Sequence, residues 1–153
     1  MSDILLPPQK RTSVWNTITE AAARGEFILP VCTQCKSIQY PPREICKDCL
    51  SADLHWEQIP SVGVVIANTE LQASTSAFFR EHLPHAVVLV KLDCGPIIFA
   101  HSADSSLECE QRVRLLNRQD IGGSGIFIAV KENDSNAEIN LASAIPGLLH
   151  EQP

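Results

Sequence analysis

The chain has 153 residues, of which 44% are hydrophobic and 20% are charged, and its formal net charge is −6. This composition excludes a disordered or fibrous protein. The acidic excess lies in the last two-thirds of the sequence, which argues against a nucleic acid as partner. No apolar run reaches the roughly 18 residues that a membrane helix needs, and no secretory signal pattern is recognisable. We therefore expect a cytoplasmic protein with no membrane partner.

The first predicted element is an amphipathic helix over about 13–24. Val14, Trp15 and Ile18 recur at helical spacing, and Gly25 lies where a left-handed helix end is favoured. The apolar stripe of this helix is short, so it must dock either on the body of this chain or on another subunit. We expect a separate N-terminal helical segment over 1–26.

Two cysteine pairs dominate the next segment, 27–58. The spacing Cys32-x-x-Cys35 is repeated at Cys46-x-x-Cys49, and two such knuckles close a tetrahedral shell of four thiolates around a soft divalent ion. The segment has too few large apolar residues for a core of its own. We therefore predict a rubredoxin-like zinc ribbon that binds one structural zinc per chain.

Iron is the alternative occupant of such a site. Iron knuckles of the rubredoxin type normally carry glycine directly after the second cysteine, and here Lys36 and Leu50 occupy those two positions. Zinc is therefore the favoured ion. Four cysteines leave no coordination position open for water or substrate, so the ion is expected to be structural.

The rest of the chain is rich in β-forming residues. Five strands are predicted in the segment 59–132, with a short helix over 102–111 between the third and fourth, and this order is typical of a small OB-fold barrel. The expected strands cover 62–69, 86–92, 97–101, 112–117 and 126–131. The tail, 133–153, is expected to be frayed rather than docked. The fold class is thus mainly β: an N-terminal helix and a zinc ribbon followed by a five-stranded OB-fold barrel.

No catalytic constellation is recognisable in the sequence. The five histidines show no metal-helix spacing and are interpreted as surface residues. Cys94 and Cys109 lack an obvious base that would activate a thiol. We therefore expect a chain without catalytic residues that is not itself an enzyme.

Two features are candidates for ligand or partner contact. Arg112, Arg114 and Arg118 fall on one face of the fourth predicted strand, where they suit a phosphate group or form an ordinary solvated face. Phe78 and Phe79 are adjacent aromatic residues in a polar loop. Such a pair marks a contact surface, or one ring folds back to plug the barrel.

The order of these parts resembles a known family over about residues 12–131. The segments "GEFILPVCTQCKSIQYPPREICKDC" and "LPHAVVLVKLDCGPIIFA" carry the resemblance. The family consists of acyl-CoA-associated proteins that join a rubredoxin-like zinc ribbon to an OB-fold, known as domain-of-unknown-function family 35. Two departures are evident. Glu110 stands where the family commonly has glycine, and His85 stands where a tyrosine often occurs, so His85 is a further candidate contact.

The resemblance implies a function in acyl-CoA and lipid metabolism. It implies a non-catalytic accessory subunit that binds a thiolase-like enzyme and helps to frame its CoA and acyl site, with a CoA thioester at the interface. The alternative partner is a MaoC-like acyl-CoA hydratase or an aldolase. A different class of function, an OB-fold that binds single-stranded nucleic acid, needs stacking aromatics and a basic groove, and the net charge opposes it.

Overall fold

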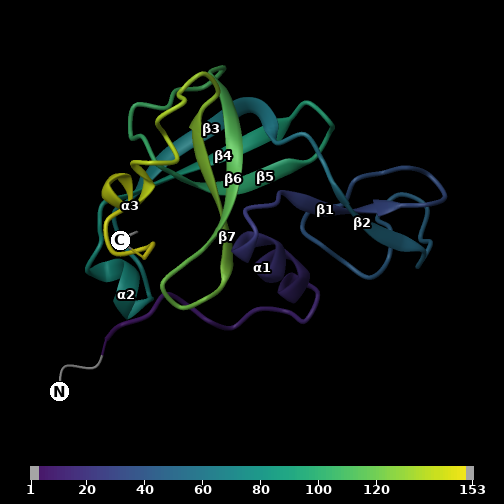
Figure 1. Ribbon diagram of the computed structural model, residues 1–153, viewed down its shortest axis with the longest axis horizontal. Coiled ribbons are helices and arrows are strands. Elements are labelled where there is room, and N and C mark those ends of the chain that lie inside the picture. The colour runs from purple at the N-terminus through teal and green to yellow at the C-terminus, as the bar shows by residue number, and fades with distance from the viewer. Residues whose placement is uncertain (1–3, 151–153) are drawn as a thin grey trace.

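The computed structural model describes residues 4–150. A small two-stranded ribbon lies at one end of a closed barrel, and helix α1 lies between them; helices α2 and α3 lie at the opposite end (Figure 1). The elements are α1 (Trp15–Ala23), β1 (Ile28–Cys32), β2 (Leu54–Gln58), β3 (Val62–Leu71), α2 (Ala77–Arg80), β4 (His85–Leu92), β5 (Ile97–Ser102), β6 (Arg112–Gln119), β7 (Gly125–Lys131) and α3 (Leu141–Ala144).

Five strands close the barrel in the order β3-β4-β5-β7-β6. The neighbours pair antiparallel except β5 and β7, which are parallel. This is the OB-fold order, and the predicted fold class is confirmed. Alternate side chains such as Val88, Val90, Ile98 and Ala100 are buried in the core, which is the period-two pattern expected of a strand with one buried face. The helix predicted over 102–111 is wrong, because turns occupy the segment between β5 and β6.

Gly63 allows β3 and β4 to approach closely at one corner of the barrel. A Cβ atom at this position would lie 2.3 Å from the carbonyl oxygen of Lys91, a separation that atoms do not tolerate. The strand register shifts between Val65 and Ala67, so β3 bends as it passes from one neighbour to the other. Glycine is therefore required at the start of this strand.

The C-terminal segment is docked on the barrel, which makes the prediction of a frayed tail wrong for residues 133–150. Leu141, Ile145, Leu148 and Leu149 are buried in a second hydrophobic cluster on the outer side of β6 and β7. Phe78 of α2 belongs to the same cluster. The apolar tail residues thus cover a face of the sheet that would otherwise be exposed.

Helix α1 docks on the body of its own chain. The Trp15 indole donates a hydrogen bond to the Gly125 carbonyl (2.9 Å), and Gly125 N–H donates to the Thr19 hydroxyl (3.0 Å). The buried Asn117 amide donates to the carbonyls of Ile18 and Glu26, both at 3.0 Å. These contacts to β6 and β7 show that the helix docks on its own chain, one of the two possibilities that the sequence leaves open.

Phe127 of β7 joins the three parts of the molecule. Its ring centroid lies 5.9 Å from that of Trp15 in α1, 5.0 Å from Phe27 before β1, and 6.1 Å from Tyr40 in the ribbon. Phe27 and Phe127 belong to the main hydrophobic core together with Leu29, and the partly buried Trp15 and Tyr40 pack against it. The ribbon, helix and barrel therefore share one continuous core.

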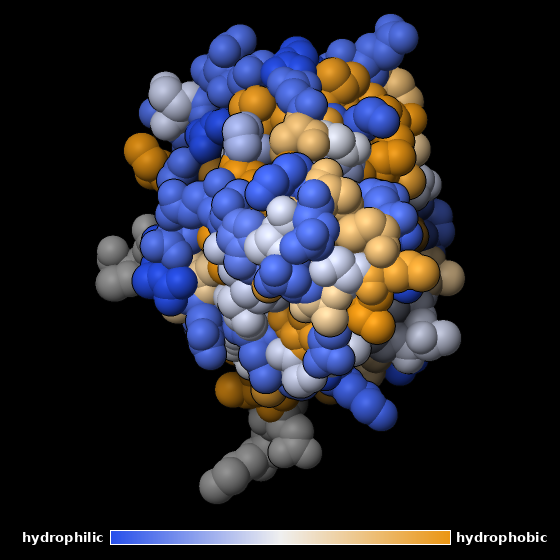
Figure 2. Space-filling model, turned by 90° about the vertical axis from the view of Figure 1, so that its right-hand side faces the viewer, coloured by the Kyte–Doolittle hydropathy of each residue, from blue (hydrophilic) through white to orange (hydrophobic). Residues whose placement is uncertain are grey.

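Exposed apolar side chains lie together on the outer face of β3, β4 and β5. Ile66, Leu89, Ile97 and Phe99 are 43%, 38%, 45% and 44% exposed, and Leu89 is the direct cross-strand neighbour of Phe99. We call these four residues the apolar face. Viewed from the ribbon end, most of the surface is hydrophilic, and hydrophobic residues are scattered over it with more of them on the right-hand side (Figure 2).

Replacing Phe127 by alanine should lower the free energy of unfolding by about 3–5 kcal/mol, because the cavity would open where three aromatic rings meet. Denaturant unfolding followed by tryptophan fluorescence measures the change. Phe99→Ala is the matched control, since this ring is half-exposed and its loss should cost less than about 1 kcal/mol. Equal losses for the two variants would contradict the role of Phe127.

Candidate functional site

The four predicted cysteines converge on one point of the ribbon. The Sγ atoms of Cys32 and Cys49 are 3.5 Å apart, as are those of Cys35 and Cys46, and all four lie within 4.8 Å of one another. A tetrahedral ion with metal–sulfur bonds of about 2.3 Å needs sulfurs about 3.8 Å apart. The arrangement fits a single ion, and the four cysteines are a candidate metal centre.

The two knuckles have the same backbone geometry. Lys36 N–H donates to the Cys32 carbonyl and Leu50 N–H to the Cys46 carbonyl, both at 3.0 Å. Lys36 and Leu50 each have a φ of 61°, the left-handed region that favours glycine. Lys36 and Leu50, which stand where iron knuckles usually have glycine, thus adopt the left-handed backbone conformation that glycine favours.

Backbone N–H groups favour the thiolate form of two of the ligands. In the first knuckle these groups, that of Cys35 foremost, lower the pKa of the Cys32 thiol to about 6. The backbone N–H of Cys49 likewise lowers the pKa of Cys46. Backbone hydrogen bonding thus favours the thiolate form of the first cysteine of each knuckle, which is the form that binds a metal. Burial and hydrogen bonds to the neighbouring thiols act the other way on the second cysteines, and they raise the pKa of Cys35 to about 12 and also raise that of Cys49.

Gln39 contacts a cysteine of the candidate metal centre without being a ligand itself. This contact was not predicted from the sequence. Gln39 is 1% exposed, and its Nε2 lies 3.4 Å from the Cys46 sulfur and 3.1 Å from the Ser37 hydroxyl. Its Oε1 accepts a hydrogen bond from the Lys47 N–H at 3.0 Å. A lone glutamine between the knuckles carries no sequence signal for this contact, which arises only when the ribbon folds.

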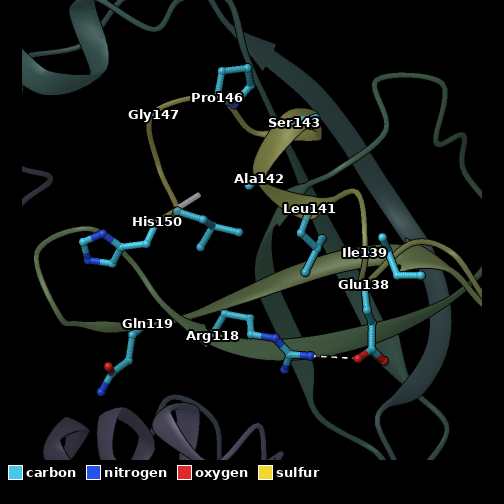
Figure 3. A pocket seen from close by; sticks show the side chains of 11 residues that line it. Arg118, Gln119, Glu138, Ile139, Leu141, Ala142, Ser143, Pro146, Gly147 and His150 are labelled. Carbon is cyan, nitrogen blue, oxygen red and sulfur yellow. Dashed lines mark hydrogen bonds and ion pairs between the residues drawn. The ribbon is translucent and has the colours of Figure 1, made fainter. Parts of the chain in front are cut away.

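The three predicted arginines lie on β6 as expected, and each is paired within the chain. Arg112 binds Asp93 at 2.7 Å and Glu132 at 3.1 Å. Arg114 and Arg118 both bind Glu138 of the C-terminal segment, at 2.8 and 3.0 Å, and Figure 3 shows the Arg118 pair at the edge of a hollow of about 500 Å³. Phosphate binding by this stripe stays a prediction, and a phosphate would have to replace these carboxylates.

The adjacent phenylalanines have different environments on α2. Phe78 is 2% exposed and stacks on His82 with ring centroids 4.4 Å apart, so this ring folds back into the second cluster. Phe79 is half-buried and faces His85 and His101, at 5.3 and 6.1 Å between centroids. Partner or ligand contact by either ring stays a prediction.

His85 and His101 form a pair, so the interpretation of all five histidines as surface residues is wrong. His85 is 8% exposed, and its Nε2 lies 2.8 Å from Nδ1 of His101. Burial lowers the pKa of His85, and burial together with the charges of His85 and Arg11 lowers the pKa of His101 to about 3. Both rings are therefore neutral at ordinary pH. His101 was not predicted, because strand pairing brings it beside His85.

Glu110, the departure from the family pattern before β6, adopts a φ of 71°. This left-handed conformation explains why glycine is favoured there. None of the helices within residues 4–150 is long and apolar enough to cross a membrane.

Comparisons with known proteins identify the ribbon and the fold. Residues 19–55 match the family model described as the ChsH2, rubredoxin-like zinc ribbon domain. The Ltp2-ChsH2(DUF35) aldolase contains a chain with a TM-score of 0.65 and 21% identity, and the match covers 80% of this chain and 97% of that chain. A DUF35 protein of unknown function from Sulfolobus solfataricus has a TM-score of 0.49 and 13% sequence identity. This match covers 65% of this chain and 75% of that chain. No curated protein matches significantly.

These findings confirm the resemblance to the DUF35 family, with its rubredoxin-like ribbon and five-stranded barrel. They also correct one prediction. The expectation that the chain is not an enzyme is contradicted, because a chain of this fold is part of a protein named as an aldolase. The sequence of one chain carries no signal for a role in an enzyme that is built from two different chains. The alternative of nucleic-acid binding receives no support.

Gln39→Leu should weaken metal binding about 10–100-fold, because it removes the hydrogen bonds that orient the second knuckle. Competition with a chromophoric chelator measures the affinity, and Cys46→Ser, which removes a ligand, sets the lower limit. Gln34→Leu is the matched control, since Gln34 is exposed between the cysteines of the first knuckle. Equal affinities for the wild type and Gln39→Leu would contradict the supporting role of Gln39.

Proposed function

We propose that this chain is one subunit of a two-component enzyme that makes or breaks a carbon–carbon bond in an acyl-CoA, and that its partner is thiolase-like. The observation that carries the proposal is the similarity to the ChsH2(DUF35) chain of an aldolase over 97% of that chain. The ribbon match supports it independently of the barrel. The sequence resemblance favours a thiolase-like partner over a MaoC-like hydratase.

The metal of the ribbon is proposed to be zinc, one ion per chain, with a structural role. The donor set supports this assignment, because four thiolates satisfy the tetrahedral preference of zinc and leave no position open for substrate. The ion would bind Cys32, Cys35, Cys46 and Cys49. It would hold the two knuckles together, because the large side chains of this segment pack into the core shared with the barrel and not between the knuckles.

The apolar face is the proposed partner contact. Isolated exposed apolar residues are ordinary, but side chains adjacent on three neighbouring strands form a continuous strip, and such strips mark interaction surfaces. Aromatic residues near the centre of an interface contribute most to binding, which singles out Phe99. Lys91 lies opposite Ile97 in the strand register and provides a charge at the border of the strip.

We propose that the chain consists of four segments: an N-terminal helical segment (1–26), the ribbon (27–58), the barrel (59–132) and the C-terminal tail (133–153). These segments are not expected to fold independently. The continuous core around Phe127 supports treating the first three as one cooperative structure. The second cluster ties the fourth unit to the barrel. An experiment on this protein should therefore use the full chain.

Phe99→Glu should abolish the complex, because it places a charge in the centre of the apolar face, where binding would bury it unpaired. Native mass spectrometry of the chain purified gently from its own cells reads the metal and the partner together. We expect the wild type to carry one zinc and a thiolase-like chain, and Phe99→Glu to keep the zinc and the melting temperature but lose the partner.

The control is Ile139→Glu, since Ile139 is 78% exposed and lies outside the apolar face. This variant should keep the partner. A wild-type chain that is isolated without a protein partner, or with a hydratase, would contradict the thiolase-like assignment. Loss of the partner from both variants would contradict the role of the apolar face.

A further inference from the structure

Within residues 4–150, strand β2 of the ribbon has one edge that pairs with no other strand. Its inner edge pairs with β1, where Val31 lies opposite His55. The other edge of β1 is occupied by an isolated bridge between Val31 and Ile38. The ribbon projects from the barrel at the end away from α2 and α3 (Figure 1). The outer edge of β2 is therefore the free edge of the ribbon.

The hydrogen bonds at the two ends of the β1–β2 pairing fix which backbone groups point outward. Ile59 N–H donates to the Phe27 carbonyl (3.2 Å), and Thr33 N–H donates to the Asp53 carbonyl (3.0 Å). In an antiparallel pair, residues bonded in this way alternate with residues whose N–H and C=O groups point away from the partner strand. The outward-directed residues of β2 are Leu54, Trp56 and Gln58.

The outward backbone groups are not used within the described part of the chain. The N–H and carbonyl groups of Trp56 and Gln58 form no hydrogen bond there, and Leu54 N–H makes only a 3.2 Å contact with the Ala52 carbonyl. An uncovered strand edge is a template for pairing with an extended segment of another chain. A hollow of about 340 Å³, lined in part by Leu54 and Trp56, lies beside this edge, so the space next to the strand is open.

The sequence of β2, LHWEQ, is complementary to itself when two copies pair antiparallel about Trp56. In that register the outward groups of Trp56 meet those of Trp56 in the second copy, and those of Leu54 meet those of Gln58. His55 then lies directly opposite Glu57 of the second copy. Their backbones are not hydrogen bonded to each other at this point, so the two side chains are close. The contact occurs twice, because the pairing is twofold symmetric.

Trp56 is the only centre of symmetry that uses the whole strand. A twofold pairing must be centred on an outward-directed residue, and a centre at Leu54 or Gln58 leaves part of β2 unpaired. The half-buried Trp56 side chains would be neighbours at the centre, and aromatic cross-strand pairs stabilise a sheet. Tryptophan is also among the residues that contribute most to protein interfaces.

His55 and Glu57 are complementary groups that are open to a second copy. Their side chains are 41% and 51% exposed, and His55 Nε2 is hydrogen bonded to Glu57 Oε1 within one strand. Across the seam between two copies, each ring would face a carboxylate of the other strand. Opposite groups in such positions are favourable, whereas like charges directly opposite each other are destabilising.

We propose that the free edge of β2 pairs with β2 of a second copy of this chain, antiparallel and centred on Trp56, so that the two ribbons form one four-stranded sheet. The interface does not rest on the proposed two-component enzyme, because the edge of the ribbon and the apolar face of the barrel share no residue. A dimer formed in this way uses none of the residues proposed to contact the enzyme partner.

An NMR dilution series of the isotopically labelled full chain, purified with its metal, measures the dimer and locates it. Two short strands bury little area, so we expect a weak dimer with a Kd of about 0.1 mM. The series should run from about tenfold below to tenfold above that concentration. Shifts should concentrate at residues 54–58, and the amide hydrogens of Trp56 and Gln58 should exchange more slowly in the dimer.

Charge variants test the register. Glu57→Lys removes the acceptor opposite His55, and His55→Glu places two carboxylates opposite each other, so each should weaken the dimer at least about fivefold. The double variant, with both changes, restores opposite charges across the seam and should return the affinity to within about twofold of the wild type. Since both side chains are exposed, the melting temperature of the dilute protein should be unchanged in all three variants.

Phe99→Glu tests the apolar face as the alternative interface between copies, and this variant should keep the dimer. Four results would each overturn the proposal: a wild-type chain that stays monomeric over the whole series, wild-type affinity in both single charge variants, a double variant no tighter than the single ones, or loss of the dimer in Phe99→Glu. Because no enzyme partner is present in the series, none of these results bears on the proposed two-component enzyme.

Discussion

The contact of Phe127 with Trp15, Phe27 and Tyr40 is the constraint on which the arrangement of the molecule depends. The ribbon has too few large side chains for its own core, and those it has point into the barrel's core at this junction. The proposed metal would hold the two cysteine knuckles together, and the aromatic contact fixes the end of the ribbon next to the barrel. Helix α1 completes the junction, because its indole is hydrogen bonded to β7. The position of the ribbon relative to the apolar face follows from these contacts.

The sequence predicts features that depend on local spacing. The cysteine knuckles repeat at fixed intervals, and the five barrel strands alternate buried and exposed residues, so both were correctly predicted from the chain alone. Features that depend on distant contacts were not predicted. Gln39 meets Cys46 only in the folded ribbon, His101 meets His85 only through the pairing of β4 and β5, and Glu138 reaches the arginines of β6 only because the tail docks. The apolar residues of that tail could have predicted docking, since they have no other way to leave water.

The proposed partner surface includes Phe99, whose ring is 44% exposed on the apolar face. The paired arginines lie on β6, where carboxylates of the same chain occupy them. The β4–β5 side therefore offers exposed apolar side chains, whereas the arginines of β6 are already paired with carboxylates. A chain of this kind can belong to an enzyme through the surfaces that it brings to a complex.

The most direct test of the two-component enzyme is a comparison of carbon–carbon bond cleavage in a β-hydroxyacyl-CoA by this chain, by a purified thiolase-like partner, and by the two mixed in equal amounts. We expect turnover by the mixture and at least about a hundredfold slower turnover by either chain alone, with the rate saturating at a fixed ratio of the chains. Full activity of the partner without this chain, or of this chain without the partner, would contradict it.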